Sequence, residues 1–148
     1  MRIKFEVIDD YKDTVTPRKS YKSDAGWDLY ALDEVILPPS QVVFIPVGIR
    51  LVMPIDADVF ALNATPSGLA KRGLTVLGGI IDPGYAGDCG PLLLNTTAHP
   101  QKISSHMKVS QLVFLSRVEV VVDNDLVSKF VRKPKVWSVR DARDVPSL

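Results

Sequence analysis

Proline and glycine interrupt this chain so often that long helices are disfavoured. Its 148 residues include eleven prolines and nine glycines. Proline removes a backbone donor and glycine is flexible, so both weaken the interior of a helix. The runs between them are short and rich in β-branched residues, and the longest is residues 109–122. The sequence therefore predicts an all-β protein, with about ten short strands in a barrel or sandwich.

The individual strands are predicted from alternation of apolar and polar residues and from the turn residues between them. Residues 2–8 alternate charged and apolar side chains, which is typical of a half-buried strand. Further strands are predicted at 24–31, 35–37, 58–63, 74–77, 80–81, 91–97 and 109–122. Residues 41–53 are predicted to form either two short strands or one strand with a bulge. The stretches 11–23 and 99–108 are predicted to be loops, and the one helix expected is short, at 67–72.

Charge and composition exclude several classes of function. The formal net charge is +1, so the chain lacks the strong field that attracts nucleic acid or a membrane surface. Cys89 is the only cysteine, which excludes an internal disulfide and a cysteine-based metal cluster and fits a reducing compartment. No apolar run reaches transmembrane length, and residues 1–9 lack the hydrophobic core of a signal peptide. We expect an intracellular, cytoplasmic protein with no nucleic-acid or membrane partner.

A glycine-rich segment, residues 63–95, carries the candidate chemistry. Ser67 begins the short helix, where a hydroxyl and unpaired backbone N–H groups offer a site for an anion. Residues 82–85 (DPGY) predict a tight turn in which proline takes the second position and glycine takes positive φ at the third. Gly78 and Gly79, between two short strands, predict a tight β-hairpin. Taken alone, Ser67 is most simply a helix cap, and the aspartate of DPGY a turn former.

Three motifs change this interpretation when they are taken together. The chain resembles the trimeric dUTPase family in the order and spacing of DAGWDLYA at 24–31, PSGLAKRGLTVLGGIIDPGYAG at 66–87 and KVSQLVF at 108–114. The resemblance covers residues 23–115, and GGIIDPGYAG is its most specific block because it satisfies every fixed position of the family pattern. It implies a jelly-roll-like β-barrel of the β-clip type and a homotrimer.

The resemblance also implies an activity, the hydrolysis of dUTP to dUMP and diphosphate with Mg²⁺. Asp82 matches the carboxylate that activates the water attacking the α-phosphorus, and Asp28 matches the one that holds Mg²⁺ through water. Tyr85 matches the ring that packs on the deoxyribose and excludes a 2′-hydroxyl. The other matching positions are Ser67, Gly68 and Gln111 at the phosphates, and Leu77, Gly79, Ile80 and Ile81 in the hairpin whose backbone reads uracil.

Two positions in the phosphate-binding motifs depart from the family pattern. Pro66 stands where the family usually has a basic residue, so the phosphate-binding segment loses a positive charge and a backbone N–H donor. Lys108 stands where the family usually has arginine, and lysine keeps the charge without the bidentate fork.

The C-terminal part of the chain departs further from the family. The resemblance implies a barrel domain at residues 1–123 and an arm at 124–148 that reaches a neighbouring subunit. The family's glycine-rich motif is not present as such, but Arg132 and Trp137 keep its spacing from arginine to an aromatic residue. We predict that Arg132 contacts the γ-phosphate and that Trp137 stacks on uracil. The alternative is a solvated basic tail in which Trp137 packs on a neighbour.

Two other functions stay open from the sequence. A dCTP deaminase shares the fold and similar motifs, but it needs a catalytic glutamate on the strand after the turn. Residues 89–95 (CGPLLLN) contain no acid, which counts against it. A non-enzymatic member that binds nucleotide or protein would fit Pro66 and the altered arm. The residues that favour the enzyme are the intact Asp28, Asp82, Tyr85 and Gln111.

Overall fold

A computed structural model describes residues 2–8, 11 and 13–121 of the chain. In this part, short strands and one five-residue helix form one unit that ends at Arg117. Among the described residues, no helix has the length and apolarity needed to cross a bilayer. Arg132, Trp137 and the predicted arm at 124–148 lie outside the described residues, so the predicted domain boundary stays a prediction.

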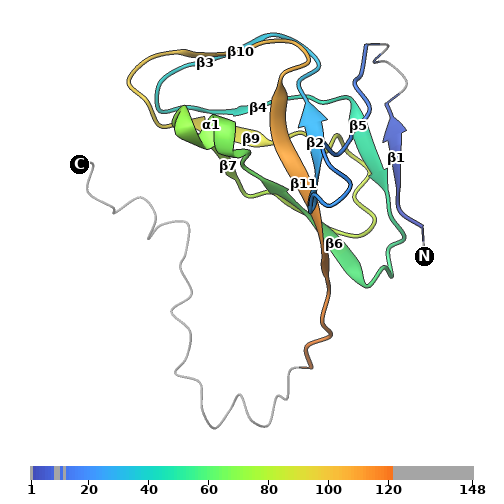
Figure 1. Cartoon of the computed structure of the whole chain (residues 1–148). Helices are drawn as coiled ribbons and strands as arrows, with labels where there is room; N and C mark the ends of the chain where they lie inside the picture. The colour runs from blue at the N-terminus through green and yellow to red at the C-terminus, as the bar shows by residue number, and fades with distance from the viewer. Residues whose placement is uncertain (1, 9–10, 12, 122–148) are drawn as a thin grey trace, which may run out of the picture. The chain divides into compact units, whose positions relative to one another are not determined.

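The all-β prediction is confirmed, and the helix predicted at 67–72 is present as α1 (Figure 1). In chain order the elements are β1 (Lys4–Val7), β2 (Gly26–Tyr30), β3 (Val35–Leu37), β4 (Val42–Phe44), β5 (Ile49–Val52), β6 (Val59–Ala64), α1 (Ser67–Lys71), β7 (Leu74–Leu77), β8 (Ile80–Ile81), β9 (Leu92–Asn95), β10 (Gln101–Ile103) and β11 (Lys108–Ser116).

The strands form two small sheets and two ribbons, and every pair in them is antiparallel. One sheet has the order β2-β11-β6-β8 and the other β4-β9-β7, while β1 pairs with β5 and β10 with β3. Figure 1 shows β11, the longest strand, between β2 and β6. This order places two of the sequence motifs side by side, because Gln111 on β11 lies opposite Asp28 on β2. On its other side, Gln111 lies opposite Ala64 on β6, just before the third motif.

The core forms where the inner faces of these strands meet. Its largest fully buried aliphatic side chains are Leu29, Leu37, Ile45, Ile49, Leu69, Leu74, Leu93, Ile103 and Leu112. Each contributes about 1.5–3 kcal/mol by leaving water. Phe5 of β1 packs on Trp27 of β2 and Phe114 of β11, with ring centroids 5.4 Å and 6.3 Å apart. The predicted half-buried strand at the N-terminus therefore attaches to the central sheet through an aromatic ring.

The strand predicted at 109–122 is shorter in the structure and ends at Ser116. Its last partner on β6 is Val59, opposite Ser116, and its last partner on β2 is Gly26, opposite Val113. Beyond those positions β11 has no neighbouring strand among the described residues, so β-branched residues alone do not extend it.

The strand β10 was missed, because residues 99–108 were predicted to be a loop. Its sequence, QKI, has too few apolar residues to show an alternating pattern. Its partner decides its structure: Lys102 lies opposite Ile36 on β3, and the side chain of Lys102 forms an ion pair of 2.7 Å with Glu34.

The predicted Gly78-Gly79 hairpin is wrong in its pairing. Both glycines have positive φ, 65° and 95°, so the sharp turn is present. However, β7 pairs with β9 and β8 pairs with β6, and the described residues show no β7–β8 ladder. Because β7 and β8 each pair with a different strand, the backbone N–H and C=O groups on their facing edges have no strand partner among the described residues.

Burial of Cys89 predicts how the stability of the protein changes at high pH. The residue is 1% exposed, and the pKa of its thiol is raised from 9.0 to about 12. Burial is the main cause of this rise. The unfolded thiol therefore ionises first, so its contribution to stability is present below pH 9 and is lost as the pH rises toward 12. Between about pH 8 and about pH 10.5 we expect the wild type to lose about 2 kcal/mol more of unfolding free energy than Cys89→Ala. Urea denaturation of both proteins measures this, and equal losses would contradict it.

Candidate functional site

The turn at residues 82–85 forms as the sequence predicts. The Tyr85 N–H donates to the carbonyl of Asp82 over 3.1 Å, and Gly84 takes a φ of 83°. Gly84 also donates its N–H to the carbonyl of Met53 over 3.3 Å, which anchors the turn next to β5. The Asp82 side chain is exposed. A carboxylate is thus presented to solvent from a backbone held at both ends.

A cavity of about 270 Å³ lies beside this turn and is called here the Gly79 cavity. It is lined by Phe44, Asn63, Leu77, Gly79, Ile80, Ile81, Tyr85, Asp88, Gly90, Pro91 and Leu92. All four positions predicted to read uracil therefore line one cavity, together with Tyr85. Most of the lining is apolar, as expected for a site that binds the faces of a flat ring.

Asn63 holds the backbone around the Gly79 cavity in place. Its backbone N–H donates to the Gly79 carbonyl over 2.8 Å, and a Cβ at Gly79 would lie 2.8 Å from the Asn63 carbonyl oxygen. Its buried amide donates to the Cys89 carbonyl over 2.8 Å and accepts from the Ser110 hydroxyl over 2.9 Å. Sequence reasoning missed this residue, although an asparagine within a predicted strand is unusual enough to signal a special role.

Asp88, which also lines the Gly79 cavity, was missed as well. Its carboxylate accepts backbone N–H groups of Gly48 and Gly90, both over 2.8 Å, and of Val47 over 3.2 Å. These charge-assisted bonds tie the loop after the turn to the backbone before β5. The bonds to Val47 and Gly48 join positions about forty residues apart, and a lone aspartate in a loop gives no sequence signal for them.

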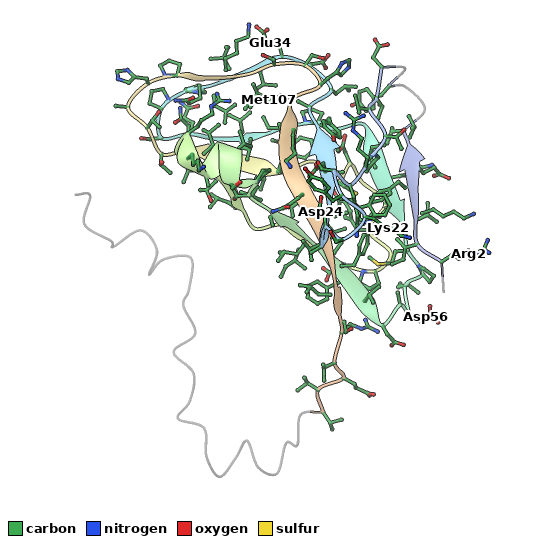
Figure 2. The ribbon with its side chains drawn as sticks, viewed as in Figure 1. Arg2, Lys22, Asp24, Glu34, Asp56 and Met107 are labelled. Carbon is green, nitrogen blue, oxygen red and sulfur yellow. The ribbon has the colours of Figure 1, made fainter. Side chains whose placement is uncertain are left out.

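A second cavity, of about 410 Å³, surrounds Asp28 and is called here the Asp28 cavity. It is lined by Ser20, Tyr21, Asp24, Ala25, Gly26, Asp28, Lys108, Gln111 and Val113. Figure 2 labels Asp24 and Lys22 on the loop that precedes β2. The structure thus brings the predicted metal-site carboxylate and the predicted phosphate-binding glutamine into one cavity.

The Asp28 carboxylate is held by contacts with two other side chains of this cavity. Its side chain is 8% exposed, with Oδ1 3.0 Å from Lys108 Nζ and Oδ2 accepting from the Ser20 hydroxyl over 3.3 Å. Lys108 therefore supplies a positive charge here, although it stands where arginine is usual. Among the described residues there is no group of three or more histidine, cysteine or acidic side chains placed to hold a metal ion. One carboxylate suffices only for a hydrated ion whose remaining ligands come from a substrate, which is how Mg²⁺ commonly binds phosphates.

The helix α1 begins differently from a capped helix. Pro66 occupies the N-cap position and α1 has no side-chain cap hydrogen bond, so the simple interpretation of Ser67 as a cap is wrong. The first bonds of the turn start at Leu69 and Ala70, which leaves the N–H groups of Ser67 and Gly68 ahead of them. A Cβ at Gly68 would meet no atom within 4 Å, so the surface there is open.

One described chain does not assemble all the predicted site residues. The Gly79 cavity and the Asp28 cavity share no lining residue, and Ser67 and Asp82 line neither. The positions predicted for the base and the sugar are thus separate from those predicted for the metal and the phosphates.

The chain is similar to known proteins of one family in sequence and in fold. Residues 12–134 match the family model of dUTPase. The chain is 38% identical over 104 residues to the deoxyuridine 5′-triphosphate nucleotidohydrolase of Clostridioides difficile, covering 68% of this chain and 71% of the relative. It is 35% identical over 112 residues to that of Clostridium novyi (strain NT), covering 74% and 78%.

Solved structures show the same fold at lower identity. A variant of the phage 80alpha dUTPase superposes with a TM-score of 0.76 at 18% identity, covering 83% of this chain and 88% of its own. A variant of the dUTPase from phage phi11 of S. aureus, reported for its coordination of a structural Mg(II) ion, gives 0.75 at 18% identity, covering 84% and 96%. The predicted jelly-roll-like β-barrel of the β-clip type is confirmed.

Proposed function

The chain belongs to the dUTPase family, and on that premise we propose that it hydrolyses dUTP to dUMP and diphosphate. The observation that carries the proposal is the Gly79 cavity, where the predicted uracil-reading residues and Tyr85 converge. Its size and apolar lining suit one pyrimidine nucleoside.

The backbone between β7 and β8 would select the base. In the described structure β7 pairs with β9 and β8 pairs with β6, but β7 and β8 do not pair with each other. Backbone N–H and C=O groups of Leu77, Ile80 and Ile81 are therefore candidates for hydrogen bonds to uracil. Cytosine presents the opposite donor and acceptor pattern at position 4. It would leave buried polar groups unpaired, which costs about 1–3 kcal/mol for each group.

Asp82 would orient the water that attacks the α-phosphorus in line with the leaving diphosphate. Its exposed carboxylate on an anchored turn can accept a proton from water without rearranging the backbone. Lys108, Gln111 and the N–H groups of Ser67 and Gly68 would bind the phosphates, and Asp28 would hold Mg²⁺ through water. When bound, the ion supplies positive charge to the phosphate oxygens.

A complete site requires more than one copy of the chain under this proposal. The two cavities of one chain are separate, so a homotrimer would place the Gly79 cavity of one subunit against the Asp28 cavity of another. The altered arm would add Arg132 at the γ-phosphate and Trp137 on the uracil. The enzyme would act on the intracellular nucleotide pool, where it would keep uracil out of DNA.

The strand that follows the turn gives no support to the deaminase alternative. The strand after the turn, β9, contains no acid, and its Asn95 is buried with its amide donating to the carbonyls of Leu37 and His99 over 3.0 Å and 2.8 Å. A deaminase therefore lacks its glutamate there. The curated relatives quoted above are named as nucleotidohydrolases.

A nucleotide panel tests the proposal. We expect diphosphate release from dUTP in the presence of Mg²⁺, and much slower release from dCTP, dTTP and UTP. Chelation of Mg²⁺ should abolish the reaction because phosphate charge is then left uncompensated. Ammonia release from dCTP would favour the deaminase, and nucleotide binding without turnover would favour the non-enzymatic module.

Replacing Trp137 with alanine tests the predicted arm with the same assay. If the ring stacks on uracil, we expect a higher KM or a lower kcat for dUTP, because stacking on an aromatic side chain is worth about 1–3 kcal/mol per base. Unchanged kinetics would remove the arm from the mechanism.

A further inference from the structure

Gly87 provides the space in which the Tyr85 ring lies. The three heavy atoms nearest to a Cβ added at Gly87 would all belong to the Tyr85 side chain: the hydroxyl oxygen, Cζ at 2.6 Å and Cε1 at 3.2 Å. Gly87 has no positive φ, so backbone conformation does not require glycine there. The absence of a side chain is needed for the position of one aromatic ring.

Asp88 fixes the far end of the same ring. The Tyr85 hydroxyl donates to the Asp88 carbonyl over 3.3 Å. That carbonyl cannot move freely, because the Asp88 carboxylate is bonded to the backbone N–H groups of Gly48 and Gly90, each over 2.8 Å. The ring is therefore held at its base by the turn and at its tip by an anchored loop.

The Tyr85 ring has room to move once these restraints change. The side chain is 48% exposed, and it lines both the Gly79 cavity and a separate cavity of about 270 Å³ bordered by Glu6, Arg50 and Met53. A displaced ring therefore has open space beside it in both cavities. A small change at Gly87 would shift the ring rather than unfold the protein.

We propose that Gly87 and Asp88 are positioning residues that set the sugar specificity of the site by holding the Tyr85 ring against C2′ of the nucleotide. This inference rests on the proposed function, in which Tyr85 leaves no room for a 2′-hydroxyl. A Cβ at Gly87 must displace ring atoms by about 1 Å to reach ordinary contact distance, which is comparable with the length added by a hydroxyl group. The ring position, and not merely the presence of tyrosine, determines whether a ribonucleotide fits.

The test is the ratio of kcat/KM for dUTP to that for UTP in a double-mutant cycle. We expect Gly87→Ala to lower this ratio by about tenfold or more, mainly by raising kcat/KM for UTP. In a Tyr85→Ala background the same change should lower it by less than about twofold, because the group through which Gly87 acts is gone. Ala86→Ser, one residue away and exposed, is the matched control and should leave the ratio unchanged.

Tyr85→Phe tests the Asp88 contact and remains informative if Gly87→Ala does not fold. It removes only the hydroxyl, so we expect the ratio to fall about two- to threefold. An unchanged ratio in Gly87→Ala, or an equal fall with and without Tyr85, would overturn the role of Gly87. An unchanged ratio in Tyr85→Phe would overturn the role of Asp88. Failure of the wild type to hydrolyse dUTP would instead remove the proposed function.

Discussion

Replacing Asp82 with asparagine is expected to lower kcat for dUTP by at least about a thousandfold, because the amide cannot take a proton from the attacking water. Binding of a non-hydrolysable dUTP analogue should change by less than about fivefold, since charge and not shape is removed. The turn should persist, because its hydrogen bond uses the carbonyl of Asp82 and asparagine is a good turn residue. Single-turnover kinetics and calorimetric titration separate these two quantities.

The matched control for this prediction is Asp56→Asn. Asp56 is exposed in the loop between β5 and β6 and is labelled in Figure 2. Its replacement by asparagine removes the same negative charge outside the motif. Its kcat should stay within about twofold of the wild type, as is usual for a surface substitution away from a site. Equal losses in both variants would mean that net charge near the turn, and not the carboxylate of Asp82, supports the reaction.

Local backbone chemistry explains what could be predicted from this sequence. The turn at residues 82–85 and the short helix at Ser67 depend on proline, glycine and their immediate neighbours, and both are present as predicted. The Gly78-Gly79 turn is local in the same sense, and its positive φ angles are also present. The predicted pairing of its two strands was wrong because β7 pairs with β9 and β8 pairs with β6 instead.

Long-range contacts explain what was missed in the site. Asp88 binds backbone groups about forty residues earlier, and Asn63 bonds to Ser110 on another strand. Neither residue belongs to a pattern that periodicity or spacing can detect, because each acts by fixing two distant segments together. The resemblance to a family identified the residues expected to touch substrate, whereas the structure shows what holds their backbone in place.

A mixture of two inactive variants is expected to regain activity if the site is shared between subunits. Asp28→Asn and Asp82→Asn each remove one carboxylate of the predicted site, and Asp82 does not line the cavity that contains Asp28. When the two chains are unfolded together and refolded as mixed trimers, about a quarter of the sites receive both carboxylates from different copies. Activity should therefore rise from near zero to about a quarter of the wild-type value.

The controls for this mixture are each variant refolded alone and the two variants mixed after separate refolding. All three should stay inactive, because restoration requires exchange of subunits and not the presence of two proteins in one solution. Size-exclusion chromatography with light scattering reports whether trimers form. Trimers without restored activity would place Asp28 and Asp82 of one site on the same chain. That outcome would contradict the arrangement within one chain, where Asp82 does not line the cavity that contains Asp28.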